Sequence, residues 1–167
     1  MLPSLIFNSE NTSMLAQQWS ELDKKILLYS REVEGHTSPF WNTSSPFDEE
    51  LKSYVSTKGE YVLWLQSKRP LIKHEIVNTV WVKTNPSGHT TEMHFYANGT
   101  LRDIALFDRA TLTGRWTLNN GVVNVAIQAD KHLYEFDIVG SDDNGIHSAV
   151  EFEDGILSSY LKLFRLS

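Results

Sequence analysis

The sequence contains no cysteine, and this absence removes several kinds of site at once. Disulfide bonds, thiolate nucleophiles and cysteine metal ligands are all excluded. Because structural disulfides belong mainly to oxidising compartments, a chain without them fits a reducing one. We therefore expect a cytoplasmic location.

Long apolar runs are missing as well. No stretch approaches the ~20 residues that a helix needs to span a bilayer. The first residues, MLPSLIFNSENTS, lack a basic segment, and Pro3 interrupts their short apolar run. They do not have the pattern of a signal peptide. We expect no membrane span.

Positive charge is scarce. The chain carries 15 lysines and arginines against 21 aspartates and glutamates, for a formal net charge of −6. A nucleic-acid-binding domain favours a basic patch or stripe. The charge balance therefore argues against a nucleic-acid partner, and it leaves the oligomeric state undetermined.

The short motifs of nucleotide, hydrolase and metal sites are also missing. The chain has no G-x-x-x-x-G-K-[ST], no G-x-G-x-x-G, no G-x-S-x-G and no H-E-x-x-H. His89 and His94 are five residues apart on one expected strand, so they face opposite ways and cannot chelate together. We expect no cofactor and no metal, and the sequence identifies no catalytic residue.

What is present is a single domain, residues 1–167, whose two parts have different periods. The first part, residues 1–70, is mainly helical. We expect a helix over 12–31, whose apolar face carries Leu15, Trp19, Leu22, Ile26 and Tyr29. A loop over 36–47 follows, which Phe40 and Trp41 pin to the core. A second helix, with Ser45 as N-cap, is expected to run to about Thr57 with Leu51, Tyr54 and Val55 on one side, and a short strand is expected over 61–65.

The second part, residues 71–167, reads as an antiparallel β-meander. Eight strands are expected, over 74–84, 89–97, 100–107, 115–119, 122–129, 132–139, 146–153 and 156–166. Most connections are short, which requires antiparallel pairing. Such a meander removes its edges by closing into an up-and-down barrel. A strongly bent open sheet packed by one or two helices is the alternative.

Alternation of apolar and polar residues selects the interior of this meander. Trp116, Val123, Val125, Ile127, Phe136 and Ile138 are expected inside, and so is Met93, whereas Glu92, His94, His147 and Glu151 are expected outside. Several polar residues share the apolar phase. They are either satisfied within a solid core or rim, or they line a cavity. The candidate ligand-binding residues are Arg102, Trp116, Tyr134, Ser148 and Tyr160.

This pattern resembles the lipocalin-like, or calycin, group. The resemblance covers roughly residues 74–166 and rests on the strand count, the hairpin order, the phrases FYANGTL and GRWTLNNGVVNV, and Gly114-Arg115-Trp116. In lipocalins a Gly-x-Trp marks the first barrel strand, where the tryptophan plugs the closed end. Here the motif falls on the fourth strand. The resemblance implies an eight-stranded barrel around a small-molecule pocket.

Three functions follow as hypotheses. The first is non-enzymatic binding of a small apolar or amphipathic ligand inside the barrel, for which a cavity of roughly 300 Å³ or more is expected. The second is a protein-interaction or assembly domain with a filled core. The third is a lyase-type or isomerase-type enzyme, which needs a titratable group with a perturbed pKa in the pocket. Arg102 is the one charged residue expected to face inward, and it is a poor acid or base.

Overall fold

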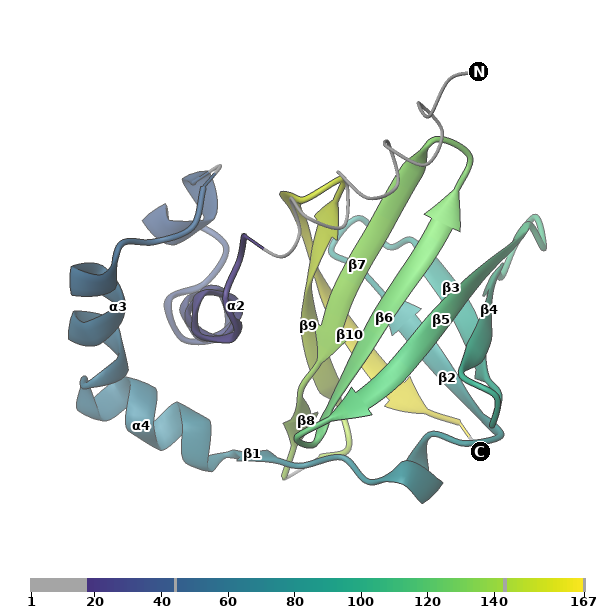
Figure 1. Cartoon of the computed structure of the whole chain (residues 1–167), viewed down its shortest axis with the longest axis horizontal. Coiled ribbons are helices and arrows are strands. Elements are labelled where there is room, and N and C mark those ends of the chain that lie inside the picture. The colour runs from purple at the N-terminus through teal and green to yellow at the C-terminus, as the bar shows by residue number, and fades with distance from the viewer. Residues whose placement is uncertain (1–17, 44, 143, 167) are drawn as a thin grey trace, which may run out of the picture.

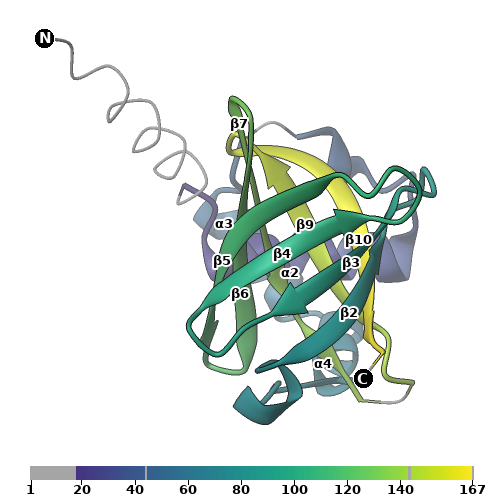
Figure 2. The ribbon, with the colours of Figure 1, turned by 90° about the vertical axis from the view of Figure 1, so that its right-hand side faces the viewer.

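The computed structural model describes residues 18–43, 45–142 and 144–166. A closed β-barrel forms the larger part of the molecule, and a group of helices packs against one side of it (Figure 1). The N-terminal helices therefore flank the barrel rather than cap either end. Figure 2 shows the same molecule with the barrel in front and the helices behind it.

The barrel is antiparallel throughout and its strands follow the order β10-β2-β3-β4-β5-β6-β7-β9. The bounds are β2 Thr79–Thr84, β3 Thr90–Phe95, β4 Thr100–Ala105, β5 Thr111–Asn119, β6 Val122–Ala129, β7 His132–Ile138, β9 His147–Glu153 and β10 Ile156–Arg165. The expected closed barrel is confirmed. Closure is made by β10 and β2, which pair from Lys162 opposite Thr84 to Arg165 opposite Trp81.

The segment between the helices and β2 covers one end of the barrel. It contains the 3-10 helix η3, Lys73–Glu75, and buries Leu71 and Ile76 against the barrel core. The Leu71 amide donates to the Gly121 carbonyl at 2.8 Å, and a side chain at Gly121 would overlap Pro70. The first barrel strand therefore begins at Thr79 and not at residue 74, because η3 closes this end.

The half of the barrel next to η3 is filled by large apolar side chains. Trp81 contacts Phe95 with their ring centroids 6.0 Å apart, and Phe95 contacts Trp116 at the same distance. The indole of Trp116 donates to the Tyr96 carbonyl at 2.9 Å. Trp116 thus points inward, as expected, and its N–H is satisfied.

Helix α2, Glu21–Tyr29, lies between the barrel and the other helices (Figure 1). The Ser20 hydroxyl accepts a hydrogen bond from the Asp23 amide, and the Asp23 carboxylate accepts one from the Ser20 amide. These two bonds form a capping box at the start of the helix. A π-helical turn, η1 Ser30–Glu34, follows. The expected start at residue 12, including Leu15, lies outside the described residues. The expected apolar face is confirmed from Trp19 onward, since Trp19, Ile26 and Tyr29 are buried and Leu22 is half-buried.

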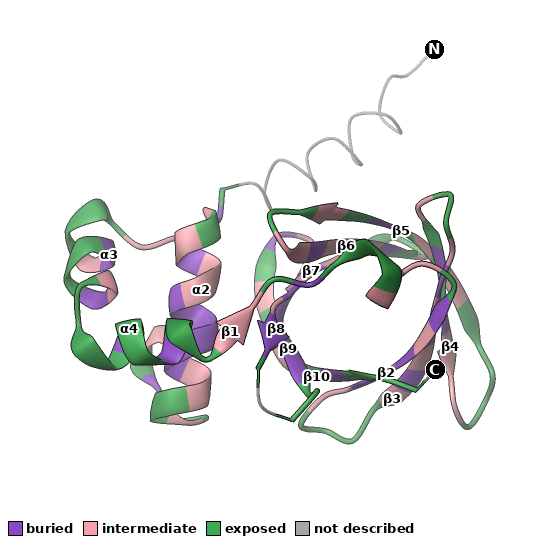
Figure 3. Cartoon of the chain, turned by 90° about the horizontal axis from the view of Figure 1, so that it is seen from below, coloured by how far each residue is buried: buried purple, intermediate pink, exposed green. Residues whose placement is uncertain are grey.

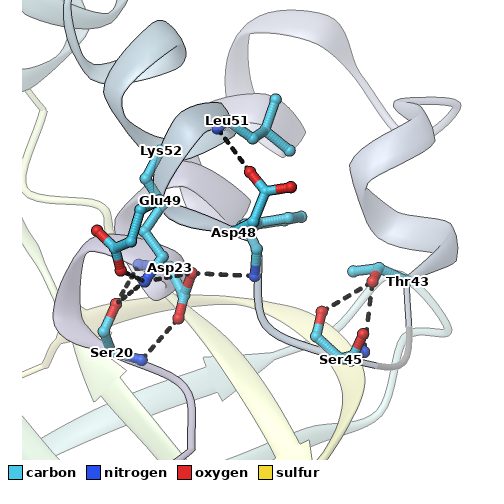
Figure 4. A network of polar contacts seen from close by, with 9 residues as sticks. Ser20, Asp23, Thr43, Ser45, Asp48, Glu49, Leu51 and Lys52 are labelled. Carbon is cyan, nitrogen blue, oxygen red and sulfur yellow. Dashed lines mark hydrogen bonds and ion pairs between the residues drawn. The ribbon is translucent and has the colours of Figure 1, made fainter.

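Helix α3 spans Glu49–Ser56, and its N-cap is Asp48. The Asp48 side chain accepts a hydrogen bond from the Leu51 amide at 2.8 Å. The expected N-cap at Ser45 is therefore three residues early, and Tyr54 is exposed. A fully buried carboxylate, Asp23, joins α3 to α2 because Lys52 lies 3.5 Å from it (Figure 4). In the loop, Phe40 and Trp41 pack on the helical core around a 3-10 turn, η2 Pro39–Asn42.

Residues 59–66 form a helix, α4 Gly59–Gln66, and the strand expected over 61–65 is wrong. The closed barrel has no open edge to pair with such a strand. Tyr61 and Trp64, one helical turn apart, pack instead against Tyr29, with ring centroids 5.3 and 5.7 Å away. Among the described residues no helix is both long and apolar enough to cross a bilayer.

The helices are attached to the outer face of β9 and β10 (Figure 3). Val150 and Phe152 of β9 pack among the helical residues rather than in the barrel interior. Glu32 of η1 accepts hydrogen bonds from Lys68 at 2.7 Å and Tyr160 at 2.7 Å. Burial alone would raise the pKa of Glu32, but these donors more than offset it and lower the pKa. A two-stranded ribbon, β1 Lys68–Arg69 with β8 Gly140–Ser141, completes the junction.

Candidate functional site

The barrel half opposite η3 contains a cavity of about 420 Å³ that is partly open to solvent. It lies at the end where β2 passes to β3, β6 to β7 and β9 to β10, so it is separated from η3 by the aromatic layer. Its walls are much more polar than the closed half. The lining residues are Lys83, Asn85, Ser87, His89, Asp103, Leu112, Ile127, Ala129, Tyr134, Glu151, Glu153, Ser158 and Ser159.

A buried ion pair forms one wall of this cavity. The Lys83 ammonium of β2 lies 2.8 Å from one oxygen of Asp103 on β4, and both side chains are almost fully buried. The two strands are not neighbours, because β3 runs between them. The ammonium also lies 5.3 Å from the centre of the Phe136 ring. The pair therefore reaches across the interior above the aromatic layer.

Two further carboxylates come from β9. Glu151 is buried, and burial followed by the nearby charges of Asp103 and Glu153 raises its pKa, with Lys83 opposing them. Glu153, nearer the mouth, accepts a hydrogen bond from the Tyr134 hydroxyl at 3.1 Å. Three acids thus line the cavity together with one lysine, and the cavity has the means to bind cations or to hold a proton.

At the rim, three potential metal ligands gather outside the cavity. His132, Glu153 and Asp154 place one ligand atom each within 4.8 Å of one another. Hydrogen bonds within the protein already engage these groups. The Asp154 carboxylate accepts one from His132 at 2.7 Å and one from the Leu133 amide at 2.8 Å. The hydrogen bond to Asp154 raises the pKa of His132. These contacts join the start of β7 to the turn between β9 and β10.

Of the five candidate ligand-binding residues, two lie in the barrel interior. Tyr134 lines the cavity and Trp116 belongs to the aromatic layer. The inward orientation expected for the other three is wrong. Ser148 and Tyr160 lie on the outer face, under the helices, and Arg102 lies exposed on the outer face of β4.

The error on β9 has a physical cause. All of its residues from His147 to Phe152 are buried, because helices cover the face that does not line the barrel. The more apolar of the two faces packs against the helices, and it carries Ser148, Val150 and Phe152. The more polar face, His147, Ala149 and Glu151, lines the interior. Alternation locates the apolar face of a strand, and here that face is outside the barrel.

His147, expected outside, is buried at the closed end. The centre of its ring lies 5.3 Å from that of Trp81, and its Nδ1 accepts a hydrogen bond from the Ser141 amide at 2.9 Å. Burial lowers the pKa of His147 to about 4, and the charge of Arg69 adds to this effect. The residue is thus a neutral structural acceptor near pH 7.

The error on β4 follows from the pairing of its charged residues. Leu101 and Asp103 face inward, and Asp103 meets Lys83 there. Arg102 lines an open groove on the outer face, and Gly114 is among the other residues that line it. A side chain at Gly114 would come within 2.5 Å of the Ala126 carbonyl, so the glycine of Gly-Arg-Trp permits close strand approach.

A signal for the missed residues is present in the sequence. Lys83, Asp103 and Glu151 each lie near the strand end at the same rim, and each is in phase with an interior residue, respectively Trp81, Leu101 and Ala149. Opposite charges at equal depth in a meander are expected to pair. Comparison with protein-family models, curated proteins and solved structures finds no match to the chain.

Proposed function

We propose that this protein binds a small amphipathic molecule in the open half of a lipocalin-like barrel, without catalysing its conversion. The observation that carries the proposal is the cavity of about 420 Å³ above a filled aromatic layer. Ligand pockets usually occupy about 300–1,000 Å³. A protein that served only as a filled assembly domain would have no need of this volume.

The closed end supports the lipocalin-like assignment. The tryptophan on the first barrel strand is Trp81, which lies beneath η3 and donates to the Thr79 hydroxyl at 2.9 Å. A tryptophan at that place is what the resemblance implies, although Thr79-Val80-Trp81 stands where lipocalins have Gly-x-Trp. Trp116 of the Gly-Arg-Trp motif packs in the same layer, from the fourth strand.

Native mass spectrometry of the protein purified from its host tests the proposal. We expect a retained small molecule with the wild type. Leu112→Trp, on the cavity wall, is expected to displace it by filling the volume. Thr111→Trp is the matched control, because Thr111 is the neighbouring exposed residue of β5. A ligand that survives Leu112→Trp, or a wild type without ligand that also fails to bind any small molecule offered to it, overturns the proposal.

A proton-transfer enzyme is the second candidate, and Glu151 is the observation that favours it. A buried carboxyl with a raised pKa beside a lysine is a suitable general acid or base. Incubating the recovered ligand with the protein in D₂O distinguishes the two functions. Solvent deuterium incorporated by the wild type and abolished by Glu151→Gln would indicate catalysis, whereas an unchanged ligand mass favours binding alone.

A further inference from the structure

The charge of the cavity points to the class of ligand. Lys83 is the one lysine or arginine among the described residues that line it, against Asp103, Glu151 and Glu153. The ammonium is already engaged with Asp103 at 2.8 Å. Glu151 and Glu153 therefore have no lysine or arginine of their own in the described lining, although the His132 ring lies 3.5 Å from Glu153 just outside it.

Asp103 provides a second, independent indication. One of its oxygens accepts from Lys83, but the other, Oδ1, is buried and has no hydrogen-bond partner among the described residues. The residue is only 4% exposed. A buried acceptor left unpaired costs about 1–3 kcal/mol, and more when it is charged. A donor that enters the cavity would recover part of this cost.

We infer that the cavity selects ligands carrying a protonated amine, whose ammonium group lies between Asp103 and Glu151. This inference rests on the proposed function and gives the chemical class of the ligand. The ammonium supplies the donors and the positive charge that the wall lacks. Leu112 and Ile127, on the opposite strands β5 and β6, provide apolar contacts for the rest of the molecule.

An anionic ligand fits the same walls poorly. Its carboxylate would have to compete with Asp103 for Lys83 and would lie close to Glu151. A carboxylate placed between like charges in a confined, low-dielectric site is repelled strongly. A neutral alcohol would avoid this repulsion but would leave the acidic excess uncompensated.

Three probes of similar size and different charge test the inference: 2-phenylethylamine, 2-phenylethanol and 3-phenylpropionate. Isothermal titration calorimetry at pH 7 and low salt measures their affinities for the full chain. We expect the amine to bind at least about tenfold more tightly than the alcohol, which corresponds to about 1.4 kcal/mol. The carboxylate is expected to bind most weakly.

Two variants locate the interaction. Asp103→Asn and Glu151→Gln are each expected to weaken amine binding about tenfold while changing alcohol binding little. If the loss of the ion pair with Lys83 prevents Asp103→Asn from folding, Glu151→Gln alone tests the position of the ammonium group. Glu92→Gln is the matched control, because it removes the same charge from the outer face of β3, where Glu92 contacts His94.

The possible outcomes separate this inference from the proposed function. Equal binding of amine and alcohol, or tightest binding of the carboxylate, overturns the amine preference and leaves small-molecule binding intact. Amine binding that Glu92→Gln weakens as much as Glu151→Gln also overturns it, because a net-charge effect would then suffice. If none of the three probes binds, the amine preference fails, and an empty wild type in native mass spectrometry would remove the proposed function too.

Proton release provides an independent readout. The groups that face Glu151 are Lys83 from β2, Asp103 from β4, Tyr134 from β7 and Glu153 from β9, with His89 at the mouth. An incoming cation favours the ionised form of Glu151, so binding at mildly acidic pH is expected to release protons. Titrations in buffers of different ionisation enthalpy measure this release, which should decrease as pH rises and should be absent in Glu151→Gln.

Discussion

The two halves of the barrel interior are built from the same eight strands but differ in chemistry. In the half next to η3, Trp81, Phe95 and Trp116 form a packed aromatic layer, and even His147 is held neutral there. In the other half, Lys83 and Asp103 face a cavity of about 420 Å³. The boundary falls within single strands, since Trp81 and Lys83 are adjacent inward positions of β2.

Apolar packing and buried charge are thus divided along the barrel axis. Apolar burial contributes about 25 cal/mol per Å², and most of it within the barrel is concentrated near the closed end. The open half can then hold buried charge whose contribution to stability is small or negative. Substitutions in the two halves should therefore differ in kind as well as in size.

The largest effect is expected at the closed end. Trp81→Ala and Trp116→Ala should each lower the free energy of unfolding by about 3–5 kcal/mol, because each leaves a cavity in the aromatic layer. Chemical denaturation measures the change. Phe107→Ala is the control, since Phe107 is 94% exposed and its removal should change stability by less than about 0.5 kcal/mol. A near-zero effect of Trp116→Ala would contradict its burial.

In the open half, Lys83→Met should destabilise the protein by about 3 kcal/mol, because it leaves Asp103 buried without its counter-ion. The double variant Lys83→Met with Asp103→Leu should recover most of this loss. A double-mutant cycle measured by denaturation gives the coupling energy. Losses that simply add in the double variant would show that the two side chains do not depend on one another.

The histidines at the two ends should respond to pH in opposite directions. His147 has a folded-state pKa of about 4, below the unfolded value of 6.5, so the unfolded chain binds the proton more readily. Stability should fall by about 2 kcal/mol between pH 8 and pH 5 through this residue. His132 has a raised pKa, so its contribution is present at low pH and is lost as pH rises.

The contribution of His147 is measured as the difference between the wild type and His147→Gln. Glu135, on the outer face of β7, also contributes to the pH dependence of wild-type stability. Burial raises its pKa to about 7, so its protonation stabilises the folded protein as pH falls. Subtracting the variant profile removes this term. A difference that does not change between pH 8 and pH 5 would show that His147 binds a proton as readily in the folded protein as in the unfolded chain, and would contradict its lowered pKa.

The smallest effect is expected at Arg102. Arg102→Ala should leave both the free energy of unfolding and ligand binding unchanged, within about 0.5 kcal/mol, because the side chain is exposed on the outer face of β4. An inward Arg102, which sequence alternation predicts, would give a marked loss of binding instead. Titration of the same ligand into both proteins decides between these orientations.

The barrel was predictable because its turns and alternation are local properties. Asn98-Gly99 and Asn120-Gly121 adopt the positive φ values that tight hairpins need at Gly99, Asn120 and Gly121. Alternation on β3, β6 and β7, which met no other layer over most of their length, gave the correct interior. Trp116 was placed correctly for the same reason.

The site was less predictable because it depends on contacts between distant elements. The helices cover the outer face of β9, and this reverses the relation between polarity and orientation for Ser148 and Glu151. Lys83 and Asp103 lie on strands that β3 separates, so the alternation of either strand alone does not show that they pair. The α4 segment likewise became helical because no sheet edge remained for it.

The pairing of β10 with β2 carries a consequence for synthesis. The first and last barrel strands are nearly eighty positions apart along the chain, from Thr84 to Lys162. On the ribosome, β2 must wait with an unpaired edge until β10 has emerged, and long-range pairing of this kind is slow. The interval before the seam forms is when the free edge of β2 is most open to pairing with another chain.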